Sequence, residues 1–136
     1  MAKLSGLGAT LAVDDSGGPT ARTISNDILS ISVSTPRGMQ DVTGINVSAA
    51  ERLLLRTDGK MDYSGVFNDT ADTGSFVVLS TASSTAVTRT HTYTVQTKVL
   101  AGEYLIPDFP LALGADGALT FSIGAVLNST VVPTWA

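Results

Sequence analysis

The residue with the widest chemical range in this chain is its single histidine, His91, which alternates with Arg89 and Tyr93 in a threonine-rich run. An imidazole can serve as a general base or as a metal ligand. A catalytic histidine needs an orienting partner, and the immediate neighbours of His91 are threonines. One histidine without any cysteine also cannot build a multi-histidine or thiolate metal centre. We therefore interpret His91 as a structural residue.

The carboxylates of the chain fall mainly at expected turns and helix starts, where aspartate accepts hydrogen bonds from the local backbone. They are Asp14, Asp15, Asp69, Asp72, Asp108 and Asp116. Residues 14–18 lack the spaced oxygen ligands of a calcium loop, and residues 6–8 are too short for a phosphate-binding loop. The sequence thus predicts no cofactor, no metal site and no enzymatic activity.

The amino-acid composition further narrows the classes of protein to which the chain can belong. With 136 residues, 43% of them hydrophobic, the chain can bury about two thirds of its unfolded surface in one domain. Its net charge of −4 argues against holding nucleic acid by phosphate neutralisation. No apolar run approaches the roughly 18 residues of a membrane span, and the first residues lack the apolar core of a signal peptide. We expect synthesis and folding in the cytoplasm and no membrane partner.

Most of the expected elements are strands, because apolar and polar residues alternate with a period of two. Residues 28–35 show it best, with Leu29, Ile31 and Val33 on one face and Ser30, Ser32 and Ser34 on the other. Further strands are expected over 8–14, 61–67, 87–95, 99–106, 111–113 and 119–123.

Two segments are expected to be short helices. Ser48 to Glu51 matches a capping box before residues 52–57, although a buried strand at 52–56 is an alternative at this length. Residues 75–82 follow capping side chains at 68–74, with Phe76 and Leu79 in the buried stripe. Residues 37–46 fit an extended loop or one arm of a hairpin.

Seven or eight strands with one or two short helices predict a mainly β fold, an antiparallel β-sandwich or barrel. We expect one domain over residues 1–136, with an N-terminal arm at 1–7 and a C-terminal tail at 128–136. Apolar side chains stand near both ends, at Leu4, Leu7 and Trp135. Because chain ends usually fray, these side chains should dock either on their own subunit or on a neighbour.

Several segments together resemble the short major tail proteins of tailed bacteriophages that infect actinobacteria. They are Ala2–Thr10, Thr35–Gly44, Glu51–Leu55, Gly65–Asn68 and Val132–Trp135. The resemblance implies a virion tail-tube subunit: a β-sandwich with a flanking helix, six copies to a ring, and rings stacked around a channel for the genome. The implied partners are copies of the same chain, other tail proteins, and DNA that passes without specific binding.

In that family a long loop and the termini make ring-to-ring contacts, and residues 37–47 and both chain ends are placed to do so here. The residues expected at contacts between subunits are Leu4, Leu7, Arg37, Met39, Val42, Pro133 and Trp135. Long alternating strands without obvious edge-blocking lysines also predict that sheet edges are completed between subunits.

The channel wall is expected to be a hydroxyl-rich sheet face, since hydroxyls and carboxylates do not attract phosphates. Its residues are Ser30, Ser32, Ser34, Asp62 and Ser64. Two other functions remain open. A capsid decoration protein would form trimers or monomers on a shell, and a receptor-binding or carbohydrate-binding module should cluster exposed aromatic residues, which make up only 6% of this chain.

Overall fold

The chain folds into antiparallel β-structure in the computed structural model, which describes residues 3, 5–15, 20–71, 74–82, 84 and 87–136. Its strands are β1 (Thr10–Asp14), β2 (Ala21–Thr23), β3 (Ile28–Ser34), β4 (Arg37–Asp41), β5 (Arg52–Thr57), β6 (Lys60–Val66), β7 (Arg89–Val95), β8 (Lys98–Leu105), β9 (Leu111–Leu113) and β10 (Leu119–Leu127). One α-helix, α1 (Ser75–Leu79), and a 3₁₀ turn at Ser25–Asp27 accompany them in the described ranges. The predicted fold class is confirmed.

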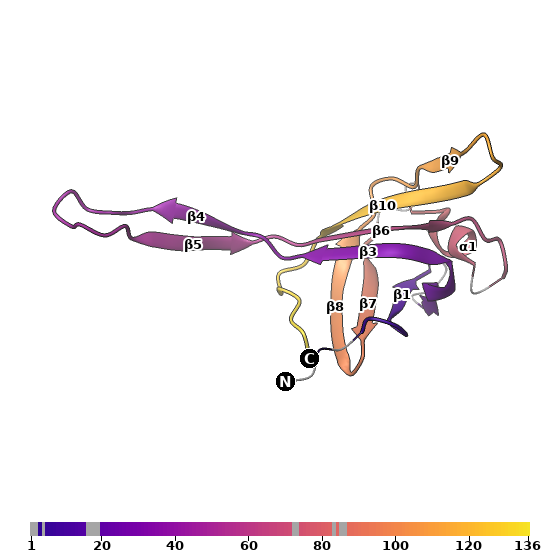
Figure 1. Ribbon diagram of the computed structural model, residues 1–136, viewed down its shortest axis with the longest axis horizontal. Helices are drawn as coiled ribbons and strands as arrows, with labels where there is room; N and C mark the ends of the chain where they lie inside the picture. Colours follow the sequence, from indigo (N-terminus) through magenta and orange to yellow (C-terminus); the bar gives the residue numbers. More distant parts are fainter. Residues whose placement is uncertain (1–2, 4, 16–19, 72–73, 83, 85–86) are drawn as a thin grey trace.

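The main sheet has the strand order β2-β1-β7-β8-β10-β6-β3, with β9 also paired to β10. It bends over on itself, so that β3, β6 and β10 form one layer and β1, β7 and β8 cross behind them as the other (Figure 1). The layers join where β8 meets β10, at the pairs Leu105–Val126 and Tyr104–Leu127.

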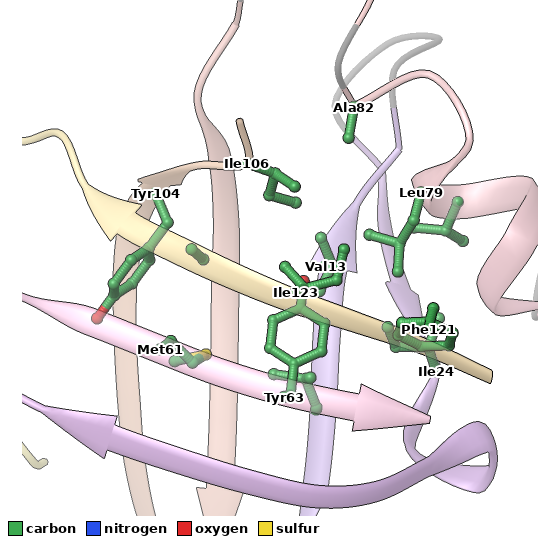
Figure 2. Packing of buried hydrophobic residues seen from close by; sticks show 13 residues of the cluster. Val13, Ile24, Met61, Tyr63, Leu79, Ala82, Tyr104, Ile106, Phe121 and Ile123 are labelled. Carbon is green, nitrogen blue, oxygen red and sulfur yellow. The ribbon is translucent and has the colours of Figure 1, made fainter. Parts of the chain in front are cut away.

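The core lies between these two layers and under α1 (Figure 2). It consists of Leu11, Val13, Ile24, Met61, Tyr63, Val78, Leu79, Ala82, Tyr104, Ile106, Phe121, Ile123 and Ala125. The period-two pattern predicted the inward direction of most strand residues here, because side chains point alternately to the two faces. Burying one large apolar side chain stabilises the fold by roughly 1.5–3 kcal/mol.

Leu29 departs from its predicted place in the core. The register between β3 and β6 shifts between Ile28 and Ser30, which is the mark of a β-bulge. The extra residue turns Leu29 outward, where it is 69% exposed. Ile31 and Val33 beyond the bulge keep their inward direction and pack against the core.

Helix α1 lies within the predicted range 75–82, but a distant residue holds its first turn. The N-cap residue is Gly74, which has no side chain to cap with. The buried Asp27 carboxylate instead accepts hydrogen bonds from the Ser75 amide and the Asn68 side chain, both at 3.0 Å. Asp27 therefore pins the helix and the preceding loop to the body. Asp72 lies outside the described residues.

The helix expected at 48–57 is wrong. Residues 52–57 form strand β5, which pairs with β4 in a two-stranded hairpin. The alternative, a strand at 52–56, has the right conformation but is exposed rather than buried. The Glu51 amide donates to the Thr43 hydroxyl, and the Glu51 carbonyl accepts from the Val42 amide. Both backbone groups of Glu51 are therefore used in the hairpin and not in a helix.

The β4–β5 hairpin prolongs β3 and β6 far beyond the two layers, as an arm (Figure 1). Pro36 and the Asp58-Gly59 pair interrupt the strands between body and arm. The Asp58 amide still donates to the Pro36 carbonyl at 2.9 Å, which keeps the two strands together at this junction. Of the two structures expected for residues 37–46, the hairpin arm is the one observed.

Candidate assembly surfaces

His91 is fully buried inside the body, so a molecule in solution cannot reach its imidazole. Its Nε2 lies 3.0 Å from the Tyr63 hydroxyl, and its Nδ1 lies 2.9 Å from the Arg89 carbonyl. Because a carbonyl only accepts, Nδ1 carries the proton and Nε2 accepts from Tyr63. Burial lowers the pKa of His91 to about 4. The imidazole is thus a neutral link between β6 and β7, as the sequence predicted for a structural histidine.

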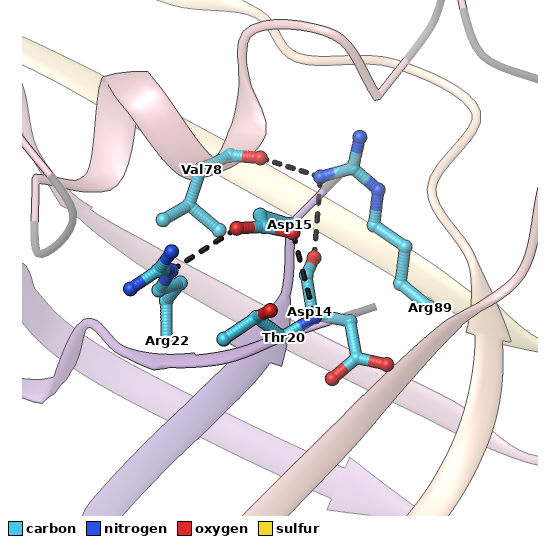
Figure 3. Close-up of polar contacts among 6 residues, drawn as sticks. All are labelled: Asp14, Asp15, Thr20, Arg22, Val78 and Arg89. Atoms are coloured by element: carbon cyan, nitrogen blue, oxygen red, sulfur yellow. Dashed lines mark hydrogen bonds and ion pairs between the residues drawn. The ribbon is translucent and has the colours of Figure 1, made fainter. Parts of the chain in front are cut away.

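Arg89 is the second buried polar group on the same face of β7, and it binds backbone rather than a ligand (Figure 3). Its guanidinium donates to the carbonyls of Val78 and Asp14, and to the Thr81 hydroxyl at 3.0 Å. Burial lowers its pKa. Arg89 therefore ties the last turn of α1 to the end of β1.

Two of the predicted turn aspartates accept local backbone hydrogen bonds, whereas Asp14 is the last residue of strand β1. Asp15 accepts a hydrogen bond from the Thr20 amide and pairs with Arg22 at 3.0 Å (Figure 3), while Asp116 accepts from the Ala118 amide at 3.1 Å. Across the described ranges, no group of three or more acidic or imidazole side chains is placed to hold a metal ion. Within the same ranges, no helix has the length and hydropathy to cross a membrane.

The five residues predicted for a channel wall lie together on the outer face of β3 and β6. Ser30 stands opposite Ser64 and Ser32 opposite Asp62, and the Ser30 and Ser64 hydroxyls are 2.7 Å apart. Strand β10 continues this face with Ser122 beside Ser64 and Gly124 beside Asp62, two positions that the sequence analysis did not include. We call the surface formed by Ser30, Ser32, Ser34, Asp62, Ser64, Ser122 and Gly124 the serine face. It is built from short, mostly polar side chains, and next to it on the same outer side lie Lys60, opposite Ser34, and Val126, opposite Lys60.

This layer also presents open strand edges. Strand β3 ends the main sheet and has β6 as its sole strand partner among the described residues. Strand β9 pairs with β10 over three residues, and the described part of the chain places no strand on its other side. Such edges carry backbone groups that can pair with another chain.

The arm exposes apolar side chains from its base to its tip. They are Met39, Val42, Ile45, Val47, Leu53, Leu54 and Leu55. Met39 pairs across the strands with Leu54 on one face of the hairpin, whereas Leu53 points to the opposite face. Of the predicted contact residues, Arg37, Met39 and Val42 therefore lie on the arm or at its tip. The prediction missed the three exposed leucines of β5. Their signal in the sequence is the unbroken run Leu53–Leu55, because three successive apolar residues place leucines on both faces of a strand.

The C-terminal residues dock along β8 of their own subunit. Val99 and Ala136 exchange both backbone hydrogen bonds, and Trp135 meets Tyr93 edge-on with ring centroids 5.9 Å apart. Pro133 is buried against Gly102, where an added Cβ would lie 2.7 Å from the proline ring. Trp135 nevertheless remains 51% exposed. The tail thus covers a sheet edge and leaves half of its largest side chain free for a neighbour.

At the other end of the chain, Ser5 contacts the turn between β7 and β8. The Gln96 side-chain amide donates to the Ser5 carbonyl at 2.7 Å. Leu7 is almost fully exposed. Leu4, the other apolar residue predicted to make contacts here, lies outside the described residues.

Comparison with known proteins gives a likeness of fold. No protein-family model and no curated protein matches the chain. Among solved structures, a chain from the tail of an empty gene transfer agent particle, refined with C6 symmetry, superposes with a TM-score of 0.77 at 15% identity, over 97% of this chain and 99% of that one.

Two further structures agree with this likeness. A chain of the native gene transfer agent virion gives a TM-score of 0.69 at 15% identity, over 91% of this chain and 95% of that one. A chain of the six-fold symmetrised anti-feeding prophage baseplate gives 0.68 at 8% identity, over 100% and 96%. The chain shares its fold with components of phage-like tails and baseplates.

Proposed function

We propose that this protein is a structural virion protein, the tail tube subunit of a tailed bacteriophage. Six copies close into a ring, and the rings stack into a tube around a channel for the genome. The observation that carries the proposal is the full-length match of fold to a chain of a gene transfer agent tail solved with C6 symmetry. The sequence resemblance adds the narrower identification as a major tail protein of a phage that infects actinobacteria.

Ring closure uses the open edges of the main sheet. Strand β3 of one copy can pair with strand β9 of the next, because each lacks a strand partner on one side among the described residues. Pairing would satisfy backbone groups that otherwise face water and would join the layers of successive copies into a continuous wall.

The serine face lines the channel in this proposal. It carries the Asp62 carboxylate among hydroxyls, and the chain as a whole has a net charge of −4. Lys60 lies on the same face opposite Ser34, but one lysine beside the Asp62 carboxylate neutralises few DNA phosphates, so in this proposal the genome passes without being held. This wall needs no cofactor and performs no chemistry.

Stacking of rings uses the arm and the chain ends. The arm projects away from the body and exposes leucines on both faces, and Leu7 and Trp135 are exposed at the two ends. The remaining partners are other tail proteins. Residues 1–136 act as one tail-tube domain with an N-terminal arm at 1–7 and a C-terminal tail at 128–136, made in the host cytoplasm and located in the virion.

Negative-stain imaging and light scattering of the purified protein test the proposal. We expect rings of six and tubes, and a Leu53→Asp/Leu55→Asp variant that remains folded but does not stack. The matched control places the same carboxylate on the serine face, as Ser122→Asp, and should still give tubes. A monomer or trimer at high concentration would favour a decoration protein and overturn the proposal. Rings that never stack would point to a baseplate component.

A further inference from the structure

The tip of the arm is an ordered loop in which Ile45 is the most exposed of three apolar side chains, with Val42 and Val47. The Thr43 hydroxyl donates to the Asp41 carboxylate and accepts from the Glu51 amide, which closes the loop at its base. The Val47 amide reaches the Gly44 carbonyl across the turn. Ile45, at the end of this loop, is fully exposed. A loop held by its own hydrogen bonds loses little conformational entropy when it binds, so the tip is organised in advance for docking.

An apolar groove of about 580 Å³ opens on the body beside the docked C-terminal residues. Its apolar lining comes from Ile31, Val33, Tyr93, Val95 and Trp135. The polar lining comes from Ser5, Gln96, Thr97 and Lys98, and Lys98 is the exposed first residue of β8. The groove therefore combines apolar side chains, the half-exposed Trp135 and one cation.

The tip cannot enter the groove of its own subunit, because the arm carries it to the far end of the molecule from both chain termini (Figure 1). Its chemistry nonetheless fits that groove. Ile45 is flanked by Val42 and Val47, which are also exposed. The base of the loop carries two acidic residues, Asp41 and Glu51, and one basic residue, Arg52, which stands opposite Asp41. Apolar side chains above a base with two carboxylates and one arginine complement an apolar groove that includes a lysine.

We propose that Ile45 of one copy inserts into the Tyr93–Trp135 groove of a second copy, with the acidic base of the loop facing Lys98. This inference rests on the proposed stacking of rings and names the surface that accepts the arm. It also gives the half-exposed Trp135 a partner, since the inserted aliphatic side chain would cover the indole face left open in the isolated subunit.

Disulfide trapping tests the contact directly, because the chain contains no cysteine. A variant with both Ile45→Cys and Thr97→Cys, the latter at the groove, should give a ladder of covalent oligomers when assembled tubes are oxidised. A control with Ile45→Cys and Ser122→Cys, and each single variant, should give no ladder. Tubes that form normally without the specific cross-link would overturn this inference and leave the proposed function intact. Absence of any ring or tube from the unmodified protein would overturn both.

Charge exchange provides a second test that does not depend on cross-linking. Lys98→Glu and Glu51→Lys should each slow tube growth, and combining them should restore growth toward that of the unmodified protein. Glu51 is suitable because the loop uses its backbone groups. Two single variants whose defects simply add, with no recovery in the double variant, would contradict the pairing of tip and groove.

Discussion

Strands β5 and β6 follow one another with only Asp58 and Gly59 between them, yet the apolar side chains of β5 are exposed and those facing inward from β6 are buried. Strand β6 buries Met61 and Tyr63 almost completely, while β5 exposes Leu53 and Leu54. The difference is not one of conformation, because both are extended and paired in antiparallel register. It comes from what lies opposite: β6 has a second layer packed on one face, and β5 has none among the described residues.

The patterns of the two strands match these surroundings. In β6, apolar and polar residues alternate, which suits a strand that is covered on one side. In β5, three successive leucines present apolar groups to both sides, as a strand covered on both sides would. A two-stranded hairpin alone is marginally stable in water. The comparison teaches that the body buries its apolar side chains within one subunit, whereas the arm leaves apolar side chains uncovered on both of its faces.

Replacing one leucine by alanine in the body and one on the arm should give the largest difference between an effect on stability and an effect on assembly. Leu100→Ala removes a side chain that is 1% exposed, and we expect a loss of about 2–5 kcal/mol in the free energy of unfolding. Leu54→Ala on the arm should change the free energy of unfolding of the isolated subunit by less than about 0.5 kcal/mol and should slow tube growth. Chemical denaturation and light scattering measure the two effects. Equal losses of stability would contradict the comparison.

Acid should weaken the body before it affects the tip of the arm. The unfolded chain takes up a proton on His91 near pH 6.5, while the folded pKa is about 4. Protons therefore favour the unfolded state, and stability should fall by about 3 kcal/mol as the pH drops from 6.5 to 4. Hydrogen bonds from Thr43 lower the pKa of Asp41 at the tip of the arm. The stability that these hydrogen bonds contribute is therefore lost only when the pH falls below 3.8, the ordinary pKa of the aspartate.

Denaturation of dilute protein over a pH series measures this dependence. A His91→Gln variant is less stable at neutral pH but should show a flatter profile between pH 6.5 and 4. A variant with the same slope as the unmodified protein would assign the acid sensitivity to other groups.

Deleting residues 131–136 should have an intermediate effect on the body and a large one on assembly. The deletion uncovers the edge of β8 and the Tyr93 ring, but Trp135 is already half exposed. We expect a folded subunit that loses about 1–2 kcal/mol, with impaired tube growth. Circular dichroism and electron microscopy check the two outcomes. A truncated chain that fails to fold would assign the tail to the core, and normal assembly would exclude a contact role.

The smallest effect on stability is expected from lysines on the serine face. Ser32→Lys and Ser64→Lys introduce two cations on the outer side of β3 and β6 and leave the core untouched. Their unfolding free energy should stay within about 0.5 kcal/mol of the original. In virions, phosphate attraction should slow genome ejection. Unchanged ejection with both lysines present in the tube would count against this face as the channel wall.

Local pattern predicted much of the body. The alternation of Met61, Tyr63, Phe121 and Ile123 with polar residues predicted both the strands and the face that packs inward, because that period depends only on the geometry of an extended chain. The residues of the serine face on β3 and β6 follow from the same period, whereas Ser122 and Gly124 join it through the pairing of β10 with β6. The bulge at Leu29 could not be predicted, since it depends on how β3 matches β6 rather than on β3 itself.

The sequence by itself therefore determined the mainly β fold, the absence of a cysteine-based or multi-histidine site and the grouping of serines on one face, all of which depend on composition or on near neighbours. Only the tertiary structure decided that residues 52–57 are a strand of an exposed arm, that Asp27 holds helix α1, and that the C-terminal tail lies along β8. These outcomes depend on partners distant in sequence, whose backbone and side-chain groups become available only when the chain folds.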